Sequence, residues 1–161
     1  MRLAAYPTLD SVVDGPGLRA VIWTQGCPHH CPGCHNPQTH DPRGGKDIPI
    51  SIIKKMIKNQ GQTGITFSGG DPMMQPEECA KLAQWAHKNN MNVWCYTGYT
   101  FDELQKKPET HKFLKEIDVL VDGRFVQSKR SLDLLFRGSS NQRLIDIPKS
   151  KGGVVLWSEK E

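Results

Sequence analysis

The chain has 161 residues, which fits one ordinary domain, and we expect residues 1–161 to form a single unit. Its formal net charge is +4 and no run of lysines or arginines exceeds two residues, which argues against a nucleic-acid-binding protein. No apolar stretch is long enough for a membrane span or a signal peptide. The sequence therefore predicts a protein of the reducing cytoplasm, where clustered cysteines more often bind metal than form disulfides.

Hydrophobic periodicity predicts alternating strands and helices. In chain order, the pattern predicts a strand over 18–25, a helix over 50–59, a strand over 65–68, a helix over 76–89, a strand over 92–97, two short helices over 100–107 and 109–117, and a strand over 119–122. Residues 125–141 are expected to form a long loop with one turn of helix. Two short apolar runs, 143–147 and 154–157, suggest a terminal β-hairpin.

This alternation predicts an α/β fold with a mostly parallel sheet and right-handed crossovers. The chain is too short for a closed eight-stranded barrel, which takes about 250 residues. An open doubly wound sheet and a partial, laterally open barrel both remain possible. Four unusual sequences follow the predicted strands: the cysteines after 18–25, Gly69-Gly70-Asp71-Pro72, Thr97-Gly98-Tyr99 and Asp122-Gly123-Arg124. Both folds gather the carboxyl ends of parallel strands, so we expect these segments to converge on one rim.

The three cysteines Cys27, Cys31 and Cys34 have the spacing C-x3-C-x2-C. Three thiolates on one short loop can bind three irons of a 4Fe-4S cluster, which usually takes four cysteine ligands. No fourth cysteine lies nearby, because Cys79 falls in a predicted helix and Cys95 in a predicted strand, where both are expected to be buried apolar residues. The fourth iron is then open to an exogenous ligand, and an amino acid can chelate it through its amine and carboxylate.

Two other interpretations of the cysteines are conceivable. His29, His30 and His35 lie among them, so a mixed zinc site is conceivable. Zinc modules place two ligand pairs some distance apart, however, and the sequence holds no second C-x2-C or H-x3-H pair. The segment from Cys31 to Cys34 also matches a thioredoxin-like C-x2-C motif. The third cysteine at a fixed offset argues against that motif.

The C-x3-C-x2-C spacing after a first strand resembles the radical S-adenosylmethionine superfamily. That resemblance implies a partial, laterally open β/α barrel, a 4Fe-4S cluster with one open iron, and S-adenosyl-L-methionine as the second cofactor. The superfamily often has an aromatic residue before the third cysteine, where this chain has Gly33, with His35 on the other side of Cys34. By resemblance, Gly33, Cys34 and His35 are expected to flank the bound cofactor.

The turn Gly69-Gly70-Asp71-Pro72 resembles the superfamily's Gly-Gly-Glu-Pro turn, which binds the amino group of the methionine moiety. The resemblance therefore implies that Gly69, Gly70 and Asp71 hold the methionine end of the cofactor. Asp71 is one methylene shorter than glutamate but keeps the acid. Asp122 and Arg124 are further candidates, because opposite charges at the rim suit a zwitterionic ligand.

Further segments resemble one family within this superfamily, the activating proteins of anaerobic ribonucleoside-triphosphate reductases. They are Asp14-Gly15-Pro16-Gly17, residues 94–99, residues 119–126, and the run 136–146, for which no mechanism follows from the residues alone. The resemblance implies an activase that makes a 5′-deoxyadenosyl radical, transfers the radical to a glycine of the reductase, and takes its electron from a flavodoxin-like donor. The alternatives are an activase of another glycyl-radical enzyme, of the formate-lyase type, or a non-catalytic metal-binding module.

Overall fold

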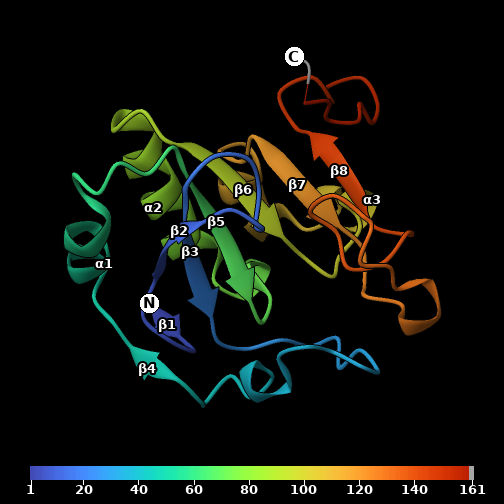
Figure 1. The fold of residues 1–161 in the computed structure, drawn as a ribbon, viewed down its shortest axis with the longest axis horizontal. Helices are drawn as coiled ribbons and strands as arrows, with labels where there is room; N and C mark the ends of the chain where they lie inside the picture. The colour runs from blue at the N-terminus through green and yellow to red at the C-terminus, as the bar shows by residue number, and fades with distance from the viewer. Residues whose placement is uncertain (160–161) are drawn as a thin grey trace.

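The computed structural model describes residues 1–159 and contains one eight-stranded sheet (Figure 1). The strands are β1 (Arg2–Leu3), β2 (Thr8–Ser11), β3 (Arg19–Thr24), β4 (Lys46–Asp47), β5 (Gly64–Gly69), β6 (Asn92–Tyr96), β7 (Val119–Asp122) and β8 (Arg143–Asp146). The α-helices are α1 (Ile50–Ile57), α2 (Pro76–Lys88), α3 (Phe101–Gln105) and α4 (His111–Leu114). Within residues 1–159, no helix is long and apolar enough to cross a membrane.

The sheet has the strand order β4-β1-β3-β5-β6-β7-β8, and β2 also pairs with β3. Its four central strands, β3, β5, β6 and β7, run parallel to one another. Strands β1 and β2 pair antiparallel with β3, and β8 pairs antiparallel with β7. The predicted alternation is confirmed at the centre of the sheet, where a helical segment precedes each of β5, β6 and β7.

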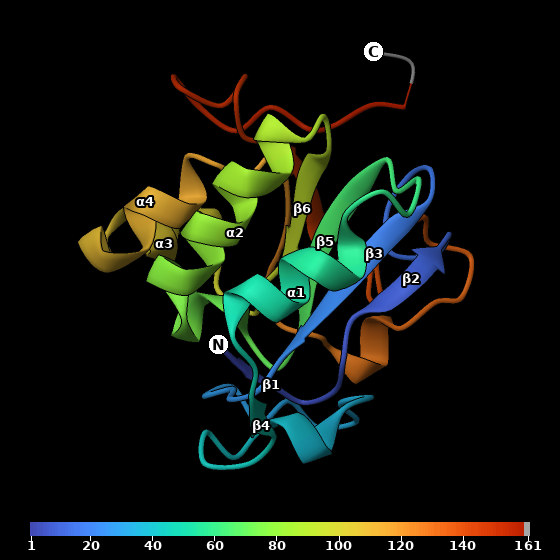
Figure 2. The same ribbon diagram turned by 90° about the vertical axis from the view of Figure 1, so that its left-hand side faces the viewer.

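The helices lie against one face of this sheet, and Figure 2 shows α1 and α2 in front of the strands. Their buried apolar residues, such as Ile53 on α1 and Leu82 on α2, pack with Phe67 of β5 in the main core. Successive residues of a strand point to opposite faces, so β6 places Val93 in this core and Trp94 in a second cluster on the other face. The second cluster also receives Phe136 and Trp157 from the C-terminal third of the chain, together with Tyr96, Val119, Val121 and Leu144.

The C-terminal prediction is only half confirmed. Residues 143–146 form a strand, but this strand pairs with β7, and the second arm of the predicted hairpin is an isolated bridge between Leu156 and Ile145. The reason is burial: Leu156 is 60% exposed, and only Trp157 of this segment packs into a cluster. The predicted loop 125–141 is confirmed, and its one helical turn is Gln127–Lys129.

Candidate functional site

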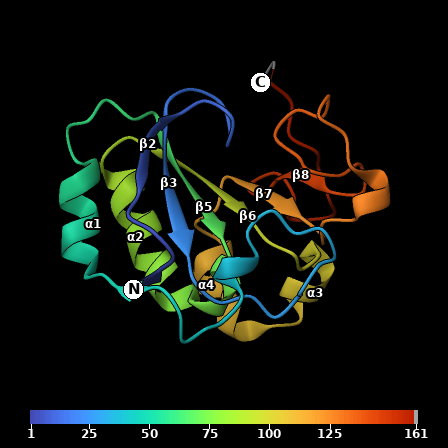
Figure 3. The ribbon, with the colours of Figure 1, turned by 60° about the horizontal axis from the view of Figure 1, so that its bottom comes forward.

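The segments that follow the four parallel strands converge as the sequence predicts, at the end of the sheet that Figure 3 brings forward. Together they line a cavity of about 420 Å³. The lining includes all three clustered cysteines, His29 and His35 from the loop after β3, Ser68 and Gly69 at the end of β5, Gly70 after β5, Thr97 and Gly98 after β6, and Gly123 after β7. The cavity therefore brings the two motifs that carry the sequence resemblance into one site.

The cysteine loop owes its shape to several residues with left-handed backbone. Gly26 and Gly33 have φ values of 103° and 75°, and His30 has a φ of 49°, a region in which most side chains are strained. Backbone hydrogen bonds close the loop, including one from Cys34 N to Cys31 O at 3.1 Å. The three clustered cysteines are partly exposed, unlike Cys79 and Cys95, which are fully buried as predicted. Burial raises the pKa of the Cys27 thiol.

The donor set fits an iron–sulfur cluster. Cys27, Cys31 and Cys34 line one cavity, but among residues 1–159 no three histidine, cysteine, aspartate or glutamate side chains are close enough to hold a single metal ion. A cubane carries its irons at separate corners, so its thiolate ligands surround the cluster without meeting at one point. All three thiols line this one cavity, so the donor set is chemically suited to such a group.

The turn after β5 packs closely under the cysteine loop. The N–H groups of Gly70 and Asp71 donate to the carbonyls of Thr24 and Gly26, at 2.8 Å in both cases. A Cβ at Gly70 would collide with the Gly26 carbonyl, so only glycine fits there. Because these N–H groups are already used, the turn suits the cationic end of a ligand better than an anion. Gly69 and Gly70 line the cavity, while the Asp71 side chain is fully buried behind them.

Asp122 and Arg124 lie near the cavity but do not pair with each other. The buried Asp122 carboxylate accepts from Arg143 Nη2 at 2.6 Å, from Arg143 Nε at 3.0 Å and from Phe101 N at 2.8 Å. These hydrogen bonds raise the pKa of the Arg143 guanidinium. The exposed Arg124 instead donates its Nε to His29 Nδ1 at 3.3 Å. The sequence could not show that β8 would bring a second arginine beside Asp122.

We expect Arg143→Gln to lower the free energy of unfolding by about 2 kcal/mol, because it leaves a buried carboxylate with one partner fewer at each oxygen. Urea denaturation measures this loss. Arg130→Gln, on an exposed position of the adjacent loop, is the control and should change stability by less than about 0.5 kcal/mol. An Arg143→Gln protein as stable as that control would show that the ion pair does not contribute to stability.

The two residues that flank Cys34, Gly33 and His35, lie in different surroundings. His35 lines the cavity, and its ring lies 5.2 Å from that of Phe125. Gly33 packs against the Gln127 side chain, and a Cβ at position 33 would clash with that side chain. The resemblance implied that both residues flank the cofactor; in the structure His35 lies on the cavity wall and Gly33 is not among the residues that line it.

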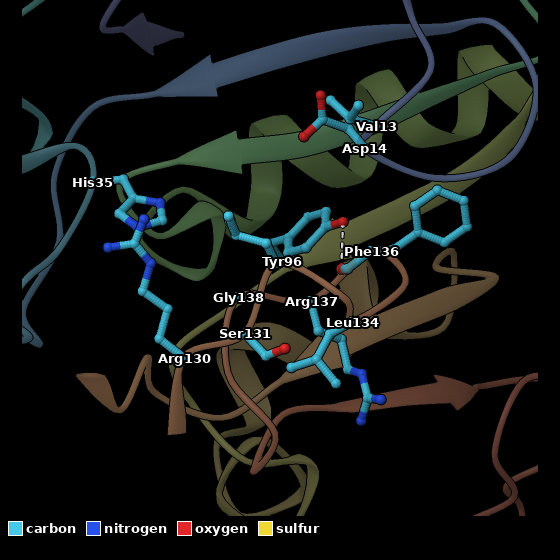
Figure 4. Close-up of a pocket in the computed structure, with 11 residues that line it drawn as sticks. Val13, Asp14, His35, Tyr96, Arg130, Ser131, Leu134, Phe136, Arg137 and Gly138 are labelled. Atoms are coloured by element: carbon cyan, nitrogen blue, oxygen red, sulfur yellow. Dashed lines mark hydrogen bonds between the residues drawn. The ribbon is translucent and has the colours of Figure 1, made fainter. Parts of the chain in front are cut away.

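A second hollow of about 270 Å³ adjoins the cavity, and residue-level reasoning did not anticipate it. Asp14, His35, Tyr96 and Gly138 line both spaces. Figure 4 shows Val13 and Asp14 across from the segment 130–138, with the Tyr96 hydroxyl donating to the Phe136 carbonyl at 2.7 Å. Its lining combines strongly exposed apolar side chains, with exposed fractions of 71% for Val13 and 89% for Leu132, with the charged Arg130 and Arg137.

Comparison with known proteins agrees with this geometry. Residues 13–145 match the model of a 4Fe-4S single cluster domain. The chain is 36% identical over 146 residues to the anaerobic ribonucleoside-triphosphate reductase-activating protein of Escherichia coli K12, covering 85% of this chain and 92% of that protein. It is 34% identical over 139 residues to the protein of the same name from Enterobacteria phage T4, covering 82% and 86%. The match, which runs through both the cysteine loop and the turn after β5, shows that the chain belongs to the family of anaerobic ribonucleoside-triphosphate reductase-activating proteins.

Proposed function

We propose that this chain activates an anaerobic ribonucleoside-triphosphate reductase by generating a glycyl radical on it. The observation that carries the proposal is the single cavity lined by both the cysteine loop and the Gly69-Gly70 turn. The names of the relatives, which cover most of the chain, supply the target. A formate-lyase type of target is the alternative within the same chemistry, and a non-catalytic metal-binding module is the alternative outside it.

In this proposal Cys27, Cys31 and Cys34 would ligate three irons of a 4Fe-4S cluster and leave the fourth iron open to S-adenosyl-L-methionine. When bound and given one electron, these cofactors would supply reductive cleavage of S-adenosyl-L-methionine to methionine and a 5′-deoxyadenosyl radical able to take a hydrogen atom from the target glycine. A flavodoxin-like protein is the electron donor that we infer, and the cytoplasm is the compartment. The protein residues supply binding, orientation and exclusion of water.

The chain's own residues have separable roles. Gly69 and Gly70 of the turn face the methionine end, since their backbone N–H groups and that of Asp71 are not all free to bind an anion and the turn suits an ammonium group. Asp71, buried behind them, supports the turn. His35 and Phe125 form an apolar and aromatic wall beside Cys34, where a nucleoside can pack. Their role would be to hold the cofactor in one orientation relative to the cysteine loop.

The second hollow gives the target protein a route to the radical. It continues from the cavity to a surface with exposed apolar side chains, Val13 and Leu132 among them, and exposed apolar patches are typical of protein-binding sites. Within residues 1–159 the terminal strands β4 and β8 do not pair, and an open sheet is compatible with a partial, laterally open barrel of the radical S-adenosylmethionine type. We propose that fold class because such an opening admits a loop of another protein.

The test is anaerobic reconstitution of the chain with iron and sulfide, followed by dithionite and S-adenosyl-L-methionine. We expect 5′-deoxyadenosine and methionine in equal amounts, and a glycyl radical by electron paramagnetic resonance when the reductase is added. Formation of the radical on a formate-lyase type enzyme instead would favour the alternative target. A protein with a complete cluster that yields no 5′-deoxyadenosine would refute the proposal.

A further inference from the structure

The Asp71 carboxylate is the most heavily hydrogen-bonded group at the site. It is fully buried, and its Oδ1 accepts from Met73 N at 3.0 Å while its Oδ2 accepts from Gly98 N at 3.0 Å. The Thr97 hydroxyl lies 2.9 Å from both oxygens. The carboxylate therefore links the turn after β5 to the end of β6, and little of its acceptor capacity is left for a ligand in the cavity.

The last partner of Asp71 comes from the cysteine loop itself. His29, midway between Cys27 and Cys31, places Nε2 2.6 Å from Asp71 Oδ2, and its side chain is 4% exposed. The other ring nitrogen, Nδ1, accepts from Arg124 Nε. Since a guanidinium can only donate, Nδ1 is assigned as the acceptor and Nε2 as the protonated donor to Asp71.

The surroundings of the His29 ring leave it little freedom. The Tyr99 ring meets it edge to face, with centroids 4.6 Å apart. On another side lies Gly98, where any Cβ would collide with the imidazole. The ring is thus held between the ends of β6 and β7 and the turn after β5. Because His29 belongs to the cysteine loop, these contacts also restrict the position of that loop.

We propose that His29 and Asp71 are positioning residues, which together hold the cysteine loop in the conformation that accepts the cluster. This inference rests on the proposed cluster site but not on the identity of the target protein. Neither residue needs to touch iron: Asp71 fixes the His29 ring, and His29 fixes the backbone between the first two ligands. A loop held in this way gives up less conformational entropy when the cluster binds.

Two substitutions of His29 separate the two ring nitrogens. His29→Gln places an amide nitrogen near the position of Nε2, so it keeps a donor for Asp71, whereas His29→Asn places its polar atoms near Nδ1 and loses that donor. We expect His29→Gln to assemble most of the wild-type amount of cluster and His29→Asn at least about 10-fold less, in the range seen when groups that support metal ligands are removed. Iron and sulfide per chain after anaerobic reconstitution measure the difference.

A second readout is the electron paramagnetic resonance spectrum of whatever reduced cluster forms. We expect the His29→Gln spectrum to match wild type and the His29→Asn spectrum to be shifted or broadened, because the ligands are no longer held in one geometry. His30→Asn is the matched control, since His30 lies on the same loop but packs against the His40 ring instead of binding Asp71. It should keep the cluster.

Equal iron content and identical spectra for His29→Asn and wild type would overturn the inference. If far-UV circular dichroism shows that His29→Asn does not fold, Thr97→Val tests the inference instead. This variant removes the hydroxyl that contacts both oxygens of Asp71 and leaves the cysteine loop unchanged in sequence. A folded Thr97→Val protein should also lose cluster, and full occupancy there would equally count against the proposal. A wild-type protein that holds its cluster but yields no 5′-deoxyadenosine would refute the proposed function alone.

Discussion

A Cys34→Ala protein should fold but retain almost no iron or sulfide, and it should form no detectable 5′-deoxyadenosine. Cys34 is the last of three thiols on one loop, and the described residues offer the cluster no replacement, since Cys79 and Cys95 are buried in the main core. Removing a group that merely supports a metal ligand costs about 10- to 100-fold in affinity or activity, and removing a ligand should cost more. Iron and sulfide analysis, together with the product assay, measures this loss.

The other two cysteines provide matched controls. Cys79→Ala and Cys95→Ala each make the same chemical change as Cys34→Ala, the loss of one thiol. At both positions burial raises the pKa of the thiol well above its ordinary value, so neither thiol is suited to bind metal as a thiolate. Both variants should keep a full cluster and lose only some stability from the main core. If Cys34→Ala kept its cluster, or either control lost it, the ligand assignment would be wrong.

The central elements were predictable because their patterns are strong. Strand β7 is a short apolar run that ends before a glycine, and helix α2 has a helical apolar pattern with a proline at its start. The structure places the ends of both within one residue of the prediction. Strands β1, β2 and β4 were not predicted. Each has four residues or fewer, which is too short for an alternating pattern to be recognised, and pairing with neighbouring strands, not local preference, makes them strands.

The candidate site was predictable to the level of segments but not of side-chain partners. The convergence of strand ends follows from topology alone, so the cavity was expected. The partner of Asp122 depends on the register of β7 with β8, which sets Arg143 opposite it. The link between His29 and Asp71 joins residues 42 positions apart through two loops, and no periodicity in a single sequence encodes such a contact.

Arg19, at the start of β3, is a cation with no exposed surface. Its guanidinium donates to Thr66 Oγ1 at 2.7 Å, to Ile65 O at 2.9 Å and to Pro16 O at 3.0 Å, and it lies 5.5 Å from the centroid of the Trp94 ring. Burial lowers the pKa of Arg19 to about 10, so it stays charged at neutral pH.

These contacts tie Arg19 to the functional site. The Thr66 hydroxyl, which accepts from Arg19, donates to the Asp14 carbonyl at 2.8 Å. Arg19 therefore fixes, directly through Pro16 and indirectly through Thr66, the segment that places Asp14 on the wall of both the cavity and the second hollow.

We expect Arg19→Met to lower the free energy of unfolding by about 3 kcal/mol. Three hydrogen bonds from a charged donor, each worth about 2 kcal/mol, are lost, and removing a charge that burial disfavours offsets part of this loss. Arg19→Lys should be nearly as destabilising, because the three acceptors are placed around a planar guanidinium and a single ammonium group cannot reach all of them. Urea denaturation measures both, with the exposed Arg43→Met as control. If Arg19→Met were as stable as wild type, the desolvation of the cation would offset all three hydrogen bonds, and Arg19 would fix the Asp14 segment without any net gain in stability.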